Sequence, residues 1–178
     1  MTAEGIADLE LGRAAEHLVV ADLILPGYRV YLTYRGLPYD VVIDYEGRLY
    51  RVQVKATRDA KKIPQRGAVG LGYLFNIRRA GKGGRRQYAD DEFDIIALVA
   101  IDIRIIAYLP SAGHLLQTIN LRPPGHGPSP RTERTHTIDQ YPIETVLAVL
   151  AGKRPVLAPR LEPARIVPSD QGRLFEGA

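Results

Sequence analysis

The sequence predicts one α/β domain, a mixed β-sheet flanked by an N-terminal helix and a short C-terminal helix. Residues 3–25 are rich in Ala and Leu, contain no Pro, and are followed by Pro26-Gly27, which ends the helix. Runs of β-branched and aromatic residues come next, separated by turn residues, and these indicate strands. Ile143–Leu150 is a second helical segment, with Pro142 at its start and Gly152 at its end.

The strand pattern and the composition place the chain among ordinary globular proteins. Its 178 residues are 46% hydrophobic and 25% charged, which is enough for one proper core. The domain is expected over residues 1–152, with a Pro/Arg-rich flexible tail at 153–178. We expect strands near residues 28–33, 40–45, 49–57, 72–78, 93–101 and 103–110, and a loop at 121–130.

Several function classes are excluded or disfavoured by composition. The chain has no Cys, which excludes Cys-based catalysis, Cys-containing zinc sites and disulfides. The longest apolar stretches are too short to span a membrane, and no signal peptide is visible, so we expect a cytoplasmic, nucleoid-associated protein. None of the four His residues has metal-ligand spacing.

The most informative segment is a predicted β-hairpin at residues 39–57, with its turn at Glu46-Gly47. Counting outward from the turn pairs Asp40 with Gln53, and residues opposite each other share a face. Lys55 lies on that same face because side chains alternate along a strand. The hairpin therefore gathers an acid, an amide oxygen and an amine, while its other face is apolar.

This combination suits metal-assisted hydrolysis. Carboxylate and carbonyl-type oxygens bind hard cations such as Mg²⁺. A nearby ammonium can orient or deprotonate an attacking water and offset phosphate charge. The alternative is a surface hairpin whose polar face is simply solvated. Asp44 shares the face but lies nearer the turn, so we expect it to be solvated; Asp94 has either a supporting or a strand-edge role.

Glu16 is the second unusual residue, because it falls in the apolar stripe of the first helix. At 100° per residue the stripe comprises Leu9, Gly12, Glu16, Val19, Val20 and Leu23. A carboxylate there is costly unless it is paired or metal-bound. A rim position reaching solvent and an internal salt bridge are the alternatives. Gly12, one turn earlier, is expected to leave space for another backbone.

A basic segment follows the hairpin. It has nine basic residues and one acid, giving a local charge of +8 in a chain of +4. We expect a mobile basic loop beside a strand that binds nucleic-acid phosphates, with solvated surface as the alternative. The basic residues are Arg58, Lys61, Lys62, Arg66, Arg78, Arg79, Lys82, Arg85 and Arg86.

The order of these elements resembles the PD-(D/E)XK nuclease superfamily. Gly12-x-x-x-Glu16 precedes Tyr39-Asp40, and Gln53-x-Lys55 follows on the next strand. The chain is most similar to the branch with Gln at the first acid of the (D/E)xK element, which includes group I intron homing endonucleases and resembles Holliday junction resolvases. The resemblance spans residues 9–110 and implies a restriction-endonuclease-like core.

The resemblance implies a role for each matching residue. The catalytic residues would be Glu16, Asp40, Gln53 and Lys55. Mg²⁺, with Mn²⁺ as an alternative, would be bound by Glu16, Asp40, Gln53 and the Val54 carbonyl. It implies a homodimer that hydrolyses phosphodiester bonds in branched or specific duplex DNA. Two readings stay open: a catalytically inactive DNA-binding or clamp-associated module, which the Gln supports, and an RNA-processing nuclease.

The tail ends in a second motif. Gln171, Leu174 and Phe175 resemble the QxxLF peptide by which bacterial replication and repair proteins bind the sliding clamp. Two apolar side chains can fill a pocket while the Gln hydrogen-bonds. The alternative is that the Leu-Phe pair packs back onto the domain.

Overall fold

The computed structural model describes residues 7–34, 36–65, 68–81, 84–89, 91–111, 117–125 and 136–153. The predicted clamp-binding peptide, Gln171, Leu174 and Phe175, lies outside these residues, as do Arg66 and Lys82. No helix in the described ranges is long and apolar enough to cross a membrane.

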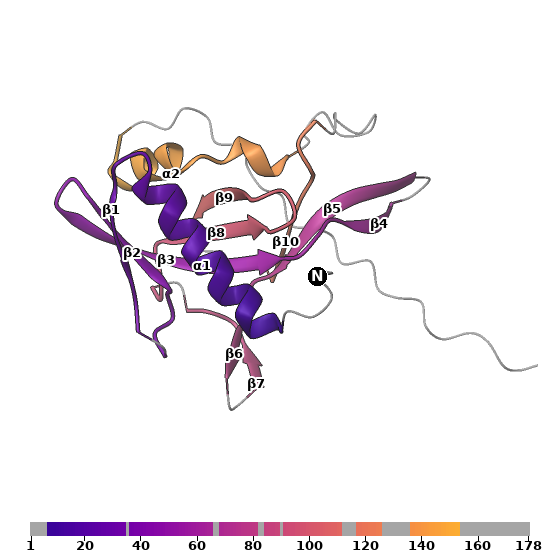
Figure 1. Cartoon of the computed structure of the whole chain (residues 1–178), viewed down its shortest axis with the longest axis horizontal. Coiled ribbons are helices and arrows are strands. Elements are labelled where there is room, and N and C mark those ends of the chain that lie inside the picture. The colour runs from indigo at the N-terminus through magenta and orange to yellow at the C-terminus, as the bar shows by residue number, and fades with distance from the viewer. Residues whose placement is uncertain are drawn as a thin grey trace, which may run out of the picture.

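The protein is a mixed α/β structure around one central sheet (Figure 1). The sheet has the strand order β1-β2-β3-β8-β9, in which only β3 and β8 are parallel. Its strands are β1 (Arg29–Leu32), β2 (Val41–Tyr45), β3 (Arg48–Thr57), β8 (Ile95–Ala100) and β9 (Ile105–Pro110). Each was predicted, to within two residues at either end.

The first helix, α1 (Asp8–Ile24), covers one face of this sheet. It ends as predicted at Pro26-Gly27: Gly27 adopts a left-handed φ of +102°, and the Tyr28 N–H donates to the Leu23 carbonyl. Ala15, Val19 and Leu23 are fully buried against the sheet. Leu9, in the first turn of α1, was expected in this stripe but is 70% exposed.

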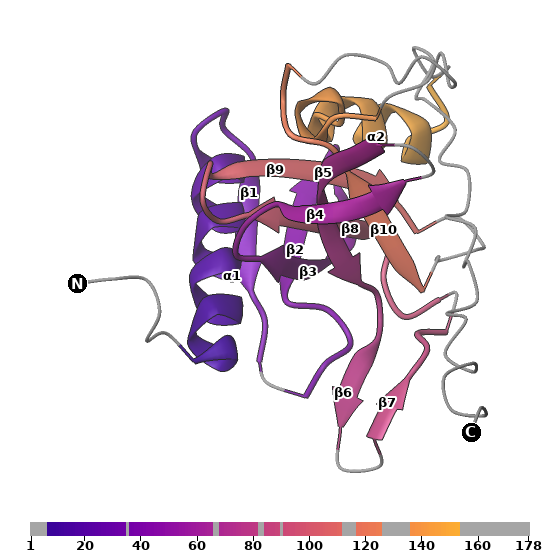
Figure 2. The same ribbon diagram turned by 90° about the vertical axis from the view of Figure 1, so that its right-hand side faces the viewer.

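A smaller sheet covers the other face, so the core has two layers (Figure 2). Its order is β10-β5-β4, from β4 (Lys61–Gln65), β5 (Ala68–Asn76) and β10 (Thr118–Leu121). Strand β8 is buried at every position because it faces both layers, which explains its continuous apolar sequence. The last elements are a 3₁₀ turn (Ile138–Gln140) and helix α2 (Ile143–Leu150), whose predicted bounds are confirmed.

The connection from β3 to β8 differs most from expectation. The basic segment was predicted to be a mobile loop beside one strand, and this is wrong for its described residues. They lie mainly in two antiparallel hairpins, β4–β5 and the short β6 (Arg79–Gly81) with β7 (Gly84–Arg86). The β6–β7 hairpin projects from the body in both views (Figures 1 and 2), and the tip of β4–β5 extends from it in Figure 1. The loop expected at 121–130 also begins inside β10.

Candidate active site

The predicted hairpin register is confirmed. Tyr45 pairs with Arg48 and Val41 with Val52, which places Asp40 opposite Gln53. The turn residues Glu46 and Gly47 have φ values of 51° and 75°, as a two-residue turn that continues the strand twist requires. The local sequence therefore fixes which side chains meet at the open end of the hairpin.

The site forms where β2 begins, because beyond this point β2 no longer pairs with the outer edge of β3. The β2–β3 ladder stops at Val41 and Val52, while β3 continues to pair with β8 up to Thr57. The Val54 N–H is the first backbone group of this edge that β2 leaves unpaired, and it donates a 2.8 Å hydrogen bond to Asp40 Oδ2. The Asp40 N–H donates in turn to the Val52 carbonyl at 2.9 Å.

Gln53 is buried beside Asp40 and bridges two oxygens. Its Nε2 donates to Asp40 Oδ2 at 2.5 Å and to the Val54 carbonyl at 3.0 Å. Our prediction had Gln53 Oε1 facing a metal, whereas here the nitrogen faces the other two predicted ligands. An amide orientation of this kind follows from the hydrogen bonds available, and a 180° flip exchanges the oxygen and the nitrogen.

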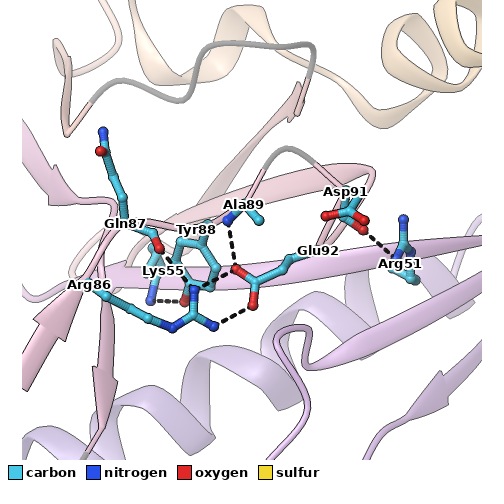
Figure 3. A network of polar contacts seen from close by, with 8 residues as sticks. All are labelled: Arg51, Lys55, Arg86, Gln87, Tyr88, Ala89, Asp91 and Glu92. Carbon is cyan, nitrogen blue, oxygen red and sulfur yellow. Dashed lines mark hydrogen bonds and ion pairs between the residues drawn. The ribbon is translucent and has the colours of Figure 1, made fainter. Parts of the chain in front are cut away.

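Lys55 is held at the same edge by groups that are distant in sequence. Its Nζ donates to the Tyr88 hydroxyl at 2.8 Å (Figure 3). It also donates to the Arg78 carbonyl at 3.1 Å. Tyr88 is 9% exposed and packs edge-on against Phe93. No local sequence pattern indicates this contact, because Tyr88 is 33 residues from Lys55.

A local network supports the segment that carries Tyr88 (Figure 3). Glu92 accepts a bidentate pair from Arg86 at 2.5 and 3.0 Å, and also the Ala89 N–H at 2.8 Å. These bonds hold the chain in place on both sides of Tyr88, at Arg86 before it and at Ala89 after it. Arg86, predicted to bind nucleic acid, is thus partly engaged within the protein.

All four predicted catalytic side chains line one cleft of about 690 Å³. Glu16 reaches it from α1, Asp40 from the end of the loop before β2, and Gln53 and Lys55 from β3. Glu16 is half-buried at the rim of the helix's packed face. Gly12 lines the cleft too: in the described structure an added Cβ meets no atom within 4 Å beyond its own helix, so the space expected beside Gly12 is open and no backbone of the described residues packs there.

The electrostatics of the site centre on Asp40. Burial raises the pKa of its carboxyl above the usual value, although the Val54 N–H bond and the Lys55 charge act in the opposite direction. Because burial disfavours the ionised form of Asp40, a cation that enters the cleft would stabilise that form. Among the described residues no group of three or more Asp, Glu or His side chains could hold a metal.

The other acids named from the sequence lie away from the cleft lining. Asp44 faces Arg29 across the β1–β2 pair at 4.0 Å. Asp94 accepts from the Arg51 backbone N–H at 2.8 Å and from the Arg51 guanidinium at 3.0 and 3.1 Å. It thus joins β3 to the start of β8, which is the strand-edge role. His17 lines the cleft from α1.

The predicted nucleic-acid residues lie on the two hairpins and beside the cleft. Lys61 and Lys62 begin β4 and are exposed, Arg58 follows β3, and the Arg78 guanidinium donates to Gln117. Across β6–β7 the backbone register pairs Arg79 with Arg86 and Arg85 with Ala80. Tyr73 and Phe75 are buried in the core, where they pack between the sheets and cannot stack on bases.

A helix over a mixed sheet, with an Asp on one strand and Gln-x-Lys on the next, defines a restriction-endonuclease-like fold. A family model described as PD-(D/E)XK endonuclease matches residues 8–136, so the chain belongs to that family. The predicted family is therefore confirmed.

The fold is also similar to that of a solved protein, the bacterial homing endonuclease I-Ssp6803I. The two are 19% identical, with a TM-score of 0.57, over 83% of this chain and 96% of that one. This confirms the predicted fold class. A search of curated proteins finds no match.

Proposed function

We propose that this protein is a metal-dependent DNA endonuclease that hydrolyses phosphodiester bonds in the cleft of Asp40, Gln53 and Lys55. One observation carries the proposal. The Gln53 amide nitrogen, a positively polarised group, lies between Asp40 Oδ2 and the Val54 carbonyl at 2.5 and 3.0 Å. Those two oxygens already converge on one point at the edge of β3, as the ligands of a cation must.

The residues present fit a hard divalent cation. Asp40 and the Val54 carbonyl offer oxygens, and flipping the Gln53 amide would add Oε1, with Glu16 supplying a second charge from α1. Mg²⁺ is the expected metal and Mn²⁺ an alternative. Such a metal polarises a phosphoryl oxygen and stabilises the charge that develops during hydrolysis.

Lys55 supplies the positive charge on the side of the cleft nearest Tyr88. Its ammonium orients the attacking water and offsets phosphate charge, and its neutral amine form could accept the proton of that water. The Tyr88 hydroxyl and the Arg78 carbonyl both accept hydrogen bonds from Nζ, so they fix where that charge stands. Asp40 stays ionised when a cation is bound, because the cation reverses the effect of burial on its pKa.

The basic hairpins are the proposed contact with the DNA backbone. The segment from Arg58 to Arg86 carries a sequence charge of +8 and lies directly after the strand that holds Gln53 and Lys55. Branched or specific duplex DNA is the proposed substrate. We further propose a homodimer, since two strands need two sites, that acts in the cytoplasm and binds a sliding clamp through its tail.

Gln53 favours one competing function, a DNA-binding module of the same fold without catalysis. An amide in place of an acid removes a negative charge from the site and weakens metal binding. The described residues then hold no cluster of three acids or His that could compensate. An RNA substrate is a further alternative, because phosphate contacts do not distinguish the polymers.

Cleavage of a four-way junction, a linear duplex and a single-stranded RNA with Mg²⁺ or Mn²⁺ tests these readings. The proposal expects metal-dependent DNA cleavage that Lys55→Ala and Asp40→Asn reduce at least 100-fold without loss of DNA binding. Salt-sensitive binding with no cleavage by the wild type would favour the binding module. Cleavage of the RNA alone would reassign the substrate.

A further inference from the structure

A second cleft lies beside the first and shares a wall with it. It measures about 490 Å³ and is lined on its far side by Arg58, Asp59 and Lys61. Five residues line both clefts: Asp8 and Gly12 from α1, and Val54, Lys55 and Ala56 from β3. The two clefts therefore adjoin along the line where α1 passes the outer edge of β3.

Gly12 is the residue of this wall that the fold does not explain. Glycine is the least favourable residue in a helix interior after proline, and Gly12 is five positions inside α1. Its φ is not left-handed, and an added Cβ would meet no described atom within 4 Å beyond its own helix. No turn and no close packing within the described protein requires a glycine here.

The charges of the second cleft suit phosphate. Arg58 lies three residues beyond Lys55, roughly 10 Å along an extended chain, and Lys61 begins the next strand. Lys55 stands between the two clefts and lines both. Asp8 and Asp59 add carboxylates, and Arg13 from α1 adds a further positive charge in the first cleft.

We propose that the two clefts form one groove, in which the backbone of a nucleic-acid strand runs from the Asp40 site over Gly12 to a second phosphate subsite at Arg58 and Lys61. Gly12 keeps the groove open, because any side chain there would stand in the path of the strand. The inference rests on the proposed nuclease function. Beyond the proposed function, it assigns the direction in which the bound strand runs and names Gly12 as the residue that sets the width of the groove.

A side-chain series at position 12 tests the groove, with Ala14 as the matched control. Ala14 is exposed on the same helix and lines neither cleft. Gly12→Ala should raise Tm by roughly 3 °C, since alanine favours the helix and meets no neighbour. Gly12→Gln should fold normally but lower kcat/KM on duplex DNA by about 100-fold, with weaker DNA binding in Ca²⁺. Ala14→Gln should change neither.

The outcomes separate this inference from the function on which it rests. If the wild type cuts DNA and Gly12→Gln cuts equally well, the groove is refuted while the nuclease stands. If Gly12→Gln and Ala14→Gln impair cleavage equally, general disturbance of α1 is the cause and the groove is refuted. If the wild type neither binds nor cuts nucleic acid, the proposed function fails and this inference fails with it.

Discussion

Restoring an acid at position 53 should make the stability of the protein depend on Mg²⁺. In the structure the Gln53 amide nitrogen lies 2.5 Å from Asp40 Oδ2, so Gln53→Glu sets two carboxylates side by side at the edge of β3. It also removes the amide N–H groups that now bond to Asp40 and to the Val54 carbonyl.

The magnitude follows from the separation. Two unit charges about 4 Å apart interact by about 4 kcal/mol at an effective dielectric constant near 20. Because the cleft is open to water, we take half of this value, about 2 kcal/mol, which corresponds to a fall in Tm of roughly 6 °C. Burial already raises the pKa of Asp40, so the variant should recover stability at acidic pH, where one carboxyl holds a proton.

Thermal unfolding in EDTA and in rising Mg²⁺ measures the effect. We expect the variant to be less stable than the wild type in EDTA, to regain or exceed its Tm in Mg²⁺, and to bind Mg²⁺ about tenfold more tightly. Gln87→Glu adds the same charge on an exposed side chain and should show neither change. Equal Tm values for wild type and Gln53→Glu in EDTA, with no added response to Mg²⁺, would refute the geometry of the site.

Three further predictions test separate parts of the structure. Tyr88→Phe keeps the ring but removes the acceptor of Lys55, so kcat should fall about tenfold with little change in KM or Tm; a change in KM alone would contradict this. Asp94→Asn weakens the bonds from Arg51 and should cost about 2 kcal/mol in urea unfolding at pH 7. Because those bonds hold the pKa of Asp94 below its usual value despite burial, the difference should vanish as pH falls below about 4, and a pH-independent difference would argue against it. Gly72→Ala should destabilise by about 1–3 kcal/mol, since its Cβ would stand 2.2 Å from a side-chain oxygen of β10; an unchanged Tm would show that this sheet adapts.

Elements set by short-range pattern were predicted well. The hairpin of β2 and β3 came out in register because its turn and alternation are local, and this alone placed Asp40 against Gln53. Helix α2 was bounded correctly by Pro142 and Gly152 for the same reason. Elements without a clear strand pattern were missed: β4 and the β6–β7 hairpin pair with the next strand along the chain, but they contain Gly or Pro and charged residues and were therefore interpreted as loop.

The sequence by itself determined the family motif and the face on which its acid, amide and amine gather, because strand alternation and a two-residue turn act over a few residues. Only the tertiary structure decided what surrounds them. β3 pairs with β8 up to Thr57, whereas its pairing with β2 stops at Val52, so the edge beyond Val52 is left open, and α1 brings Glu16 and Gly12 to it. The segment after β7 then sets Tyr88 on Lys55. These contacts join residues about 30 or more positions apart, and no local pattern encodes such distances.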